Sequence, residues 1–124
     1  MPCNVKRDLK KHGLSKEERI RKAEEFKRIR RNGKRLASEN FLMFLLKNRF
    51  CYSRLGVGIR KAMGSAVERN RAKRLIREFF RLNKARLPIG YDYVILPKRN
   101  ISHLSYHDVE RELGELIIGK PFKA

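Results

Sequence analysis

The sequence has 124 residues, and its 32 lysines and arginines against 13 acidic residues give a net charge of +19. A chain of this length fits one compact domain and excludes two ordinary ones. Because the charge is far beyond what solubility needs, we expect a polyanionic partner, with nucleic acid first and an anionic membrane surface second.

Membrane attachment and secretion find little support in the sequence. The longest apolar run, residues 41–46, is about a third of the ~20 residues that a transmembrane helix requires. The N-terminus carries positive charge but lacks the apolar stretch that follows it in a secretory signal. The sequence therefore predicts a cytoplasmic protein with no membrane partner.

The cysteines and histidines give no convincing metal site. Cys3 and Cys51 are far apart and form no Cys-x-x-Cys pair, which argues against a zinc site and predicts two reduced thiols. His103 and His107 have the i, i+4 spacing of two ligands on one helix face, but no third ligand is near them in the sequence. We expect no metal and no cofactor bound by the protein alone.

The first helix has a clear end and two possible starts. Apolar residues recur at intervals of three after Ser15, and Gly33 stops the pattern. The helix begins at Ser15 if Ser15 and Glu18 form a capping box. It begins nearer Lys22 if Ile20 folds back as a hydrophobic staple.

The rest of the chain alternates strands and helices. Strands are predicted over residues 41–46, 52–61 and 91–96, and helices over residues 66–84 and 105–118. Ser65 is the expected N-cap of the longer helix. After a flexible basic arm over residues 1–14, the order α-β-β-α-β-α predicts a single α+β domain over residues 15–120. Its helices pack on a small sheet as an α/β sandwich.

The predicted strand over residues 52–61 has one nearly bare face, because Leu55 and Val57 alternate with Gly56 and Gly58. A face without side chains lets a ligand or another chain approach closely. It is equally typical of a bulge or of tight packing against a helix. The sequence leaves both interpretations open.

The helix over residues 66–84 has two contrasting sides. One side is an apolar stripe made of Ala72, Leu75, Ile76 and Phe79. Another side carries Asn70, Lys73, Arg74, Arg77 and Arg81. Only Glu68 and Glu78 are acidic in this segment, so nucleic-acid phosphates are the natural partners of its arginines. A solvated charged face is the alternative.

This helix also carries a recognisable motif. Residues 64–81 read Gly-Ser-Ala-Val-Glu-Arg-Asn-Arg-Ala-Lys-Arg-Leu-Ile-Arg-Glu-Phe-Phe-Arg and closely resemble the Arg-Asn-Arg signature of bacterial ribonuclease P protein components. Flanking features agree in order and spacing: Glu25-Phe26, residues 54–61, residues 91–96 and residues 104–106. The resemblance covers residues 19–118.

The resemblance implies a fold similar to the second domain of ribosomal protein S5. It also implies a protein subunit of ribonuclease P, which binds a catalytic RNA and the 5′ leader of precursor tRNA and promotes endonucleolytic maturation of the tRNA 5′ end. One protein per RNA subunit is expected. Mg²⁺ is expected with the RNA, which would carry out the hydrolysis.

Carried over by position, the resemblance assigns two sets of residues. The RNA subunit would contact Arg69, Asn70, Arg71, Lys73, Arg74 and Arg77. The leader would lie in a cleft lined by Phe26, Phe44, Arg60 and Lys61, whose rings and cations suit unpaired bases and their backbone. The helical periodicity leaves Phe26 equally well explained as a core residue.

Two positions depart from the family pattern, and two rival classes remain. Arg30 stands where relatives often have a second aromatic residue, and Ala62 follows Lys61 where a second lysine is common. The leader cleft is therefore expected to depend less on stacking and on paired lysines. A structural ribosomal protein is the main alternative. An autonomous nuclease is a weaker one, because the sequence lacks clustered carboxylates or a suitable histidine pair.

Overall fold

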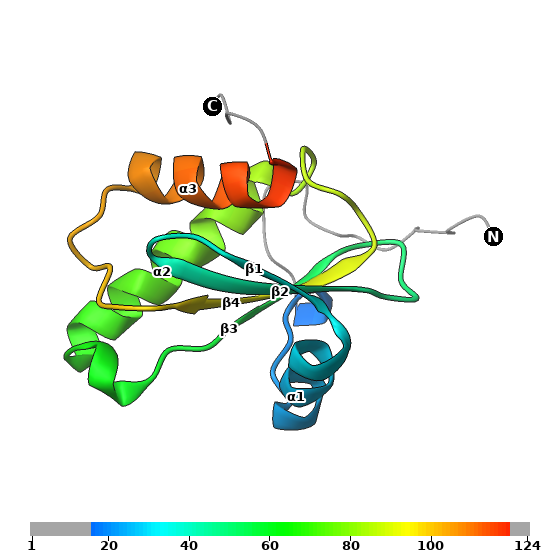
Figure 1. Cartoon of the computed structure of the whole chain (residues 1–124), viewed down its shortest axis with the longest axis horizontal. Coiled ribbons are helices and arrows are strands. Elements are labelled where there is room, and N and C mark those ends of the chain that lie inside the picture. Colours follow the sequence, from blue (N-terminus) through cyan, green and yellow to red (C-terminus); the bar gives the residue numbers. More distant parts are fainter. Residues whose placement is uncertain (1–15, 120–124) are drawn as a thin grey trace.

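A four-stranded sheet organises the described residues, 16–119, in the computed structural model of the chain (Figure 1). Its strands are β1 (Lys34–Ala37), β2 (Phe41–Lys47), β3 (Arg54–Val57) and β4 (Tyr91–Pro97), in the spatial order β1-β2-β4-β3. The pairs β1–β2 and β2–β4 are antiparallel. Strand β3 runs parallel to β4, because the chain between them returns through a long helix.

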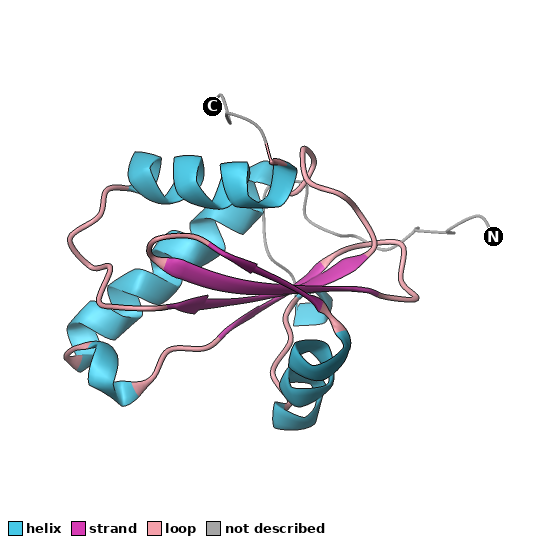
Figure 2. Ribbon diagram, in the orientation of Figure 1, coloured by secondary structure: helices cyan, strands magenta, loops and turns pink. Residues whose placement is uncertain are grey.

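Within residues 16–119, three helices cover the two faces of this sheet. They are α1 (Ala23–Asn32), α2 (Ala66–Asn83) and α3 (Tyr106–Ile118), with short 3₁₀ turns η1 (Lys16–Glu18) and η2 (Lys61–Met63). Helix α1 lies on one face, and α2 and α3 lie on the other (Figure 2). The predicted α+β sandwich is therefore confirmed.

The apolar side chains divide into a larger and a smaller core. The larger core lies between the sheet, α2 and α3, and it contains the predicted stripe of Ala72, Leu75, Ile76 and Phe79. The smaller core lies under α1 and consists of Ile20, Ile29, Phe44 and Val94. Alternation along each strand sends side chains to both cores, so the sheet is apolar on both faces where helices cover it.

Reciprocal caps fix where the two longer helices begin. Ser65 accepts a hydrogen bond from the Glu68 backbone N–H, and the Glu68 carboxylate accepts one from the Ser65 backbone N–H at 2.9 Å. Ser105 and Asp108 form the same arrangement at the start of α3. The predicted N-cap at Ser65 is thus confirmed.

The first helix begins at Ala23 after Lys22, which supports the later of its two predicted starts. Ile20 folds back into the smaller core, where it is 4% exposed. Residues 16–18 form only the short turn η1. The capping interpretation at Ser15, the arm over residues 1–14 and the reduced thiol at Cys3 all concern positions outside the described residues.

Three sequence predictions need correction. Strand β1 was not predicted, because its sequence Lys-Arg-Leu-Ala has one core-facing apolar residue and lies at the edge of the sheet. Strand β3 is shorter than residues 52–61, because its last bond to β4 is donated by Gly58 and the chain then turns into η2. Cys51 is disulfide-bonded rather than a reduced thiol.

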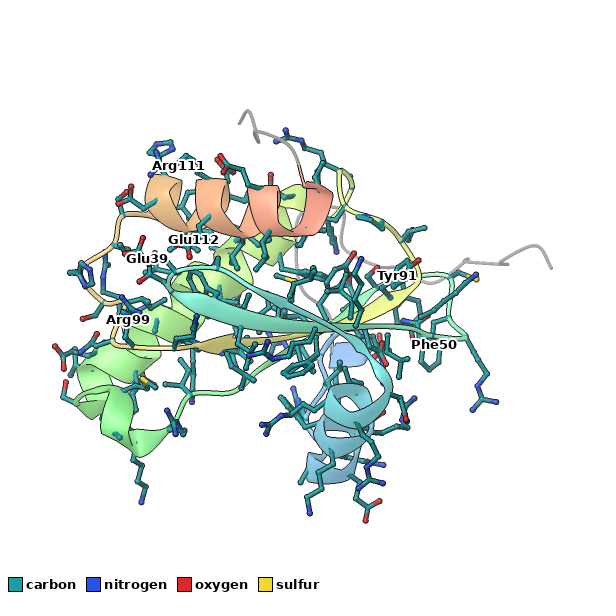
Figure 3. The ribbon with its side chains drawn as sticks, viewed as in Figure 1. Glu39, Phe50, Tyr91, Arg99, Arg111 and Glu112 are labelled. Carbon is teal, nitrogen blue, oxygen red and sulfur yellow. The ribbon has the colours of Figure 1, made fainter. Side chains whose placement is uncertain are left out.

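Helix α3 is fastened to the β1–β2 turn by Glu112. The Asn40 backbone N–H donates to the Glu112 carboxylate at 2.7 Å, and the Asn40 side-chain amide donates to its other oxygen at 2.9 Å. Ser38 donates a further hydrogen bond to the same carboxylate. Figure 3 shows Glu112 pointing from α3 toward this turn, near Glu39.

Candidate RNA interface

Helix α2 turns a basic side away from the core. Its apolar stripe packs against the sheet and α3, so residues half a turn away must lie on the outer face. Asn70, Arg74 and Arg77 occupy that face, and all three are exposed. The predicted pairing of a buried stripe with a basic outer face is therefore present on this helix.

The other predicted RNA-contact residues lie on the flanks of α2. Lys73 and Arg69 are half-buried on one flank, and the Arg69 Nε donates to the Gly64 carbonyl at 3.3 Å. Arg71 lies on the opposite flank, where its guanidinium donates to the carbonyls of Ser102 at 2.6 Å and Leu104 at 3.1 Å. The six residues thus form three groups around the helix rather than one stripe.

The outer face carries arginines without acidic partners. Neither Arg74 nor Arg77 forms a salt bridge or a side-chain hydrogen bond within residues 16–119. The carboxylate of Glu68 is held at the helix start, where the hydrogen bond from the Ser65 backbone N–H lowers its pKa. The positive charge of this face therefore remains available to an external anion.

On the other side of the sheet, Phe26 fills the bare face of β3. A Cβ atom at Gly56 would lie 2.7 Å from the Phe26 Cζ and 3.2 Å from the Ile20 Cβ. Gly56 is therefore needed for the close approach of the α1 aromatic ring. Of the two interpretations of the glycine face, tight packing against a helix is the one that the structure supports at this position.

Phe44 lies beside Phe26 in the smaller core and is 7% exposed. The Arg30 guanidinium lies over its ring, with the Arg30 Cζ 5.8 Å from the ring centroid. A recess of about 340 Å³ opens here, lined by Lys27, Arg30, Arg31 and Phe44. Arg30, where the resemblance led us to expect a second ring, thus places a planar cation over Phe44.

Arg60 and Lys61 are exposed in the turn from β3 into η2. Between this turn and α1, Leu42 and Leu96 form a directly opposed pair on β2 and β4 and remain half-buried. A Cβ atom at Gly58 would lie 2.6 Å from the Leu96 Cδ2. The predicted leader residues therefore fall into two places, the rings under α1 and the cations beyond β3, with this half-buried sheet face between them.

Sequence reasoning missed the ion network that holds α1 to the sheet. Arg54 makes two hydrogen bonds to the buried carboxylate of Asp92, from Nε at 2.8 Å and from Nη2 at 2.7 Å. Its Nη1 donates to Glu25 of α1 at 3.0 Å. These bonds raise the pKa of Arg54 above its ordinary value. The signal was present, since all three residues lie in the segments that flank the signature.

The described residues hold neither a metal-ligand cluster nor a membrane-spanning helix. No three histidine, cysteine or acidic side chains come together as a possible metal site in the part of the chain that the structure describes. Within the same part, no helix combines the length and apolar character needed to cross a membrane.

Comparisons with known proteins agree in one family. The family model for Ribonuclease P matches residues 14–119. The ribonuclease P protein component of Syntrophus aciditrophicus is 47% identical over 113 residues, which cover 91% of this chain and 95% of that protein. The corresponding protein of Petrotoga mobilis is 35% identical over 108 residues, covering 84% and 92%.

Similar solved structures belong to the same family. The RNase P protein from Thermotoga maritima superposes with a TM-score of 0.75 at 35% identity, covering 85% of this chain and 99% of that one. The RNase P protein from Staphylococcus aureus superposes with a TM-score of 0.75 at 29% identity, covering 86% and 98%. The architecture described above is therefore that of these proteins.

Proposed function

The chain belongs to the ribonuclease P protein family, which confirms the resemblance seen in its sequence, and from this membership we propose that it binds the catalytic RNA and the precursor-tRNA leader. As a ribonuclease P protein component, it takes part in tRNA processing by a ribonucleoprotein endoribonuclease. Because the chain belongs to this family, the alternative interpretation as a structural ribosomal protein is set aside.

The outer face of α2 is the main support for the proposal that this chain binds the RNA subunit. Arg74 and Arg77 are fixed to a rigid helix and have no acidic partner within residues 16–119, and an RNA backbone supplies the anions that they lack. The proposed contacts are Arg69, Asn70, Arg71, Lys73, Arg74 and Arg77. Asn70 adds an amide that can bond to a 2′-hydroxyl.

The leader is proposed to cross the sheet face between α1 and η2. Phe26 and Phe44 form its aromatic end, and Arg60 and Lys61 supply cations for the leader backbone at the other end. Because Phe44 is buried and Arg30 lies over it, we propose that the exposed guanidinium plane of Arg30 stacks on a base in place of a ring.

The hydrolysis is proposed to belong to the RNA subunit and its Mg²⁺ ions, while the protein screens phosphate charge and grips the substrate. The proposed contact residues are arginines, lysines, an asparagine and phenylalanines, which are poor general acids and bases near neutral pH. One protein per RNA subunit, acting in the cytoplasm, completes the proposal. No cofactor of the protein itself is required.

Reconstitution tests this proposal. The purified chain alone should cut no precursor tRNA, and it should restore cleavage at low magnesium concentration when the RNA subunit is added. A variant with Arg74→Gln and Arg77→Gln should bind the RNA subunit at least about tenfold more weakly. Arg99→Gln removes a charge at the end of the sheet remote from Phe50 (Figure 3) and should bind as the wild type does. Cleavage by the chain alone would contradict the proposal.

A further inference from the structure

Three arginines from two separate segments surround one recess beside α2. Arg77 comes from the outer face of the helix, and Arg19 and Arg21 come from the segment that precedes α1. The recess has a volume of about 280 Å³, and its complete lining is Arg19, Ile20, Arg21, Leu55, Val57 and Arg77. Its described walls are therefore arginine and apolar side chains, with no acidic residue among them.

Backbone pairing holds this N-terminal segment in place. Arg19 forms a parallel bridge with Leu55, and the Ile20 backbone N–H donates to the Leu55 carbonyl at 2.9 Å. The segment thus continues the sheet beyond β3, and its side chains alternate. Ile20 points into the smaller core under α1, which leaves Arg19 and Arg21 on the side of α2.

An ion pair adds a second anchor. Glu18 is 2% exposed, and its carboxylate accepts a hydrogen bond from the Lys84 ammonium, directly after α2, at 2.7 Å. The segment before α1 is therefore tied both to β3 and to the end of α2. These contacts fix the three arginines near one another without the help of any RNA.

The charges in the recess are not neutralised by the described chain. Arg19, Arg21 and Arg77 form no salt bridge and no side-chain hydrogen bond with any residue between 16 and 119. Partial burial, together with the positive charges of Arg19 and Arg21, lowers the pKa of Arg77. Three guanidinium groups that repel one another in a fixed recess form a site that one anion would stabilise.

We propose that this recess seats a single phosphate group of the RNA subunit, shared by Arg19, Arg21 and Arg77. This inference rests on the proposed function and adds to it a binding element outside the signature helix. Arg77 lies one helical turn from Arg74 on the same face of α2, so a backbone that follows this face reaches the recess next. Guanidinium forks on several sides of one phosphate give it bidentate hydrogen bonds.

The salt dependence of binding to the RNA subunit distinguishes a shared phosphate from separate contacts. Each phosphate that the protein neutralises adds about one unit to the slope of log K against log salt. Because one phosphate is shared, the triple variant should lower the slope by about one unit in all, and neither Arg77→Gln nor the double variant Arg19→Gln with Arg21→Gln should lower it by more than that. A loss of about three units in the triple variant, or an unchanged slope, would overturn the shared site.

Inorganic phosphate tests the recess without RNA. In NMR titrations of the free chain, the Nε–H resonances of the three arginines should shift together with one saturation curve. Arg77→Gln should remove the response of Arg19 and Arg21, whereas Arg99→Gln, which lies in a different cavity, should leave it intact. Independent curves for the three arginines, or a response that Arg77→Gln does not change, would overturn the site.

The two measurements also separate this inference from the proposed function. If the wild-type chain binds no RNA subunit but the three arginines still share one phosphate curve, the proposed function fails and the recess is a site for free phosphate. If RNA binding is strong but the recess variants leave its slope unchanged, the proposed function stands and the recess inference fails.

Discussion

Arginine serves opposite purposes in two regions of this protein, at the junction of α1 with the sheet and on the outer face of α2. At the junction, Arg54 is 8% exposed and is shared between Asp92 and Glu25. On α2, Arg74 and Arg77 are exposed and have no acidic partner within the described residues. The same side chain is a structural clamp in one region and an unneutralised charge in the other.

The few acidic residues decide the role of each arginine. The chain has 13 acidic residues for 32 basic ones, so most cations cannot be paired internally. Asp92 and Glu25 form salt bridges with Arg54, and Glu18 forms one with Lys84. The charge left on α2 therefore has to be compensated from outside, which is the physical basis for an RNA partner.

Removing the acid at the junction should have the largest effect. Asp92→Asn keeps the shape of the side chain but leaves Arg54 buried with only Glu25 as an acidic partner. Breaking a buried ion pair costs about 3–5 kcal/mol, and we expect about 3 kcal/mol in the free energy of unfolding because Glu25 remains. Urea denaturation measures this loss.

Glu39→Gln is the matched control for Asp92→Asn. The Glu39 side chain is 80% exposed and lies 4.0 Å from Arg99. Its replacement should change the free energy of unfolding by less than about 0.5 kcal/mol. If the two substitutions changed the free energy of unfolding equally, the Asp92–Arg54 pair would contribute no more to stability than an exposed ion pair.

A methyl group at Gly56 should have the second-largest effect. The added Cβ atom would lie 2.7 Å from the Phe26 ring and 3.2 Å from the Ile20 Cβ, so α1 has to move. Overpacking of this kind costs about 1–3 kcal/mol. Gly56→Ala should also weaken leader binding, measured with a fluorescent precursor tRNA, but it should leave the salt slope of RNA-subunit binding unchanged. A changed slope would show that the two regions are not separate.

Pattern and charge predicted much of this architecture, but not its long-range partners. The α2 stripe and the cap at Ser65 follow from residues within one helix, and local periodicity is enough to find them. The contact between Arg54 and Asp92 is not predicted by local patterns, because it joins residues 38 positions apart. Strand β1 was missed because its pattern makes sense only beside β2.

The candidate site shows the same division. The exposure of Asn70, Arg74 and Arg77 follows from the helical repeat. The hydrogen bonds of Arg71 to the Ser102 and Leu104 carbonyls depend on where the loop before α3 lies, which periodicity does not specify. For a residue held by tertiary contacts, such as Arg71, the sequence therefore could not separate a structural role from RNA contact.

Arg71 should give an intermediate result, because it belongs to the signature and also holds a loop. Its two hydrogen bonds tie α2 to Ser102 and Leu104. Arg71→Ala should lower the free energy of unfolding by about 1 kcal/mol, since the bonds are charge-assisted but exposed to solvent. Arg71→Lys keeps the charge but not the planar fork, so it should restore little of the stability. Full stability of Arg71→Ala would assign this residue to RNA contact alone.

Arg74 should have the smallest effect on folding, and it is the sharpest test of the contrast with Arg54. Arg74 is exposed and has no partner within the described residues, so Arg74→Ala should change the free energy of unfolding by less than about 0.5 kcal/mol. The same substitution should weaken binding to the RNA subunit and lower the salt slope by about one unit. Arg99→Ala removes an equal charge elsewhere and should leave that slope unchanged. If both substitutions lower the slope equally, binding depends on the total charge of the protein. The outer face of α2 would then not be a specific contact surface.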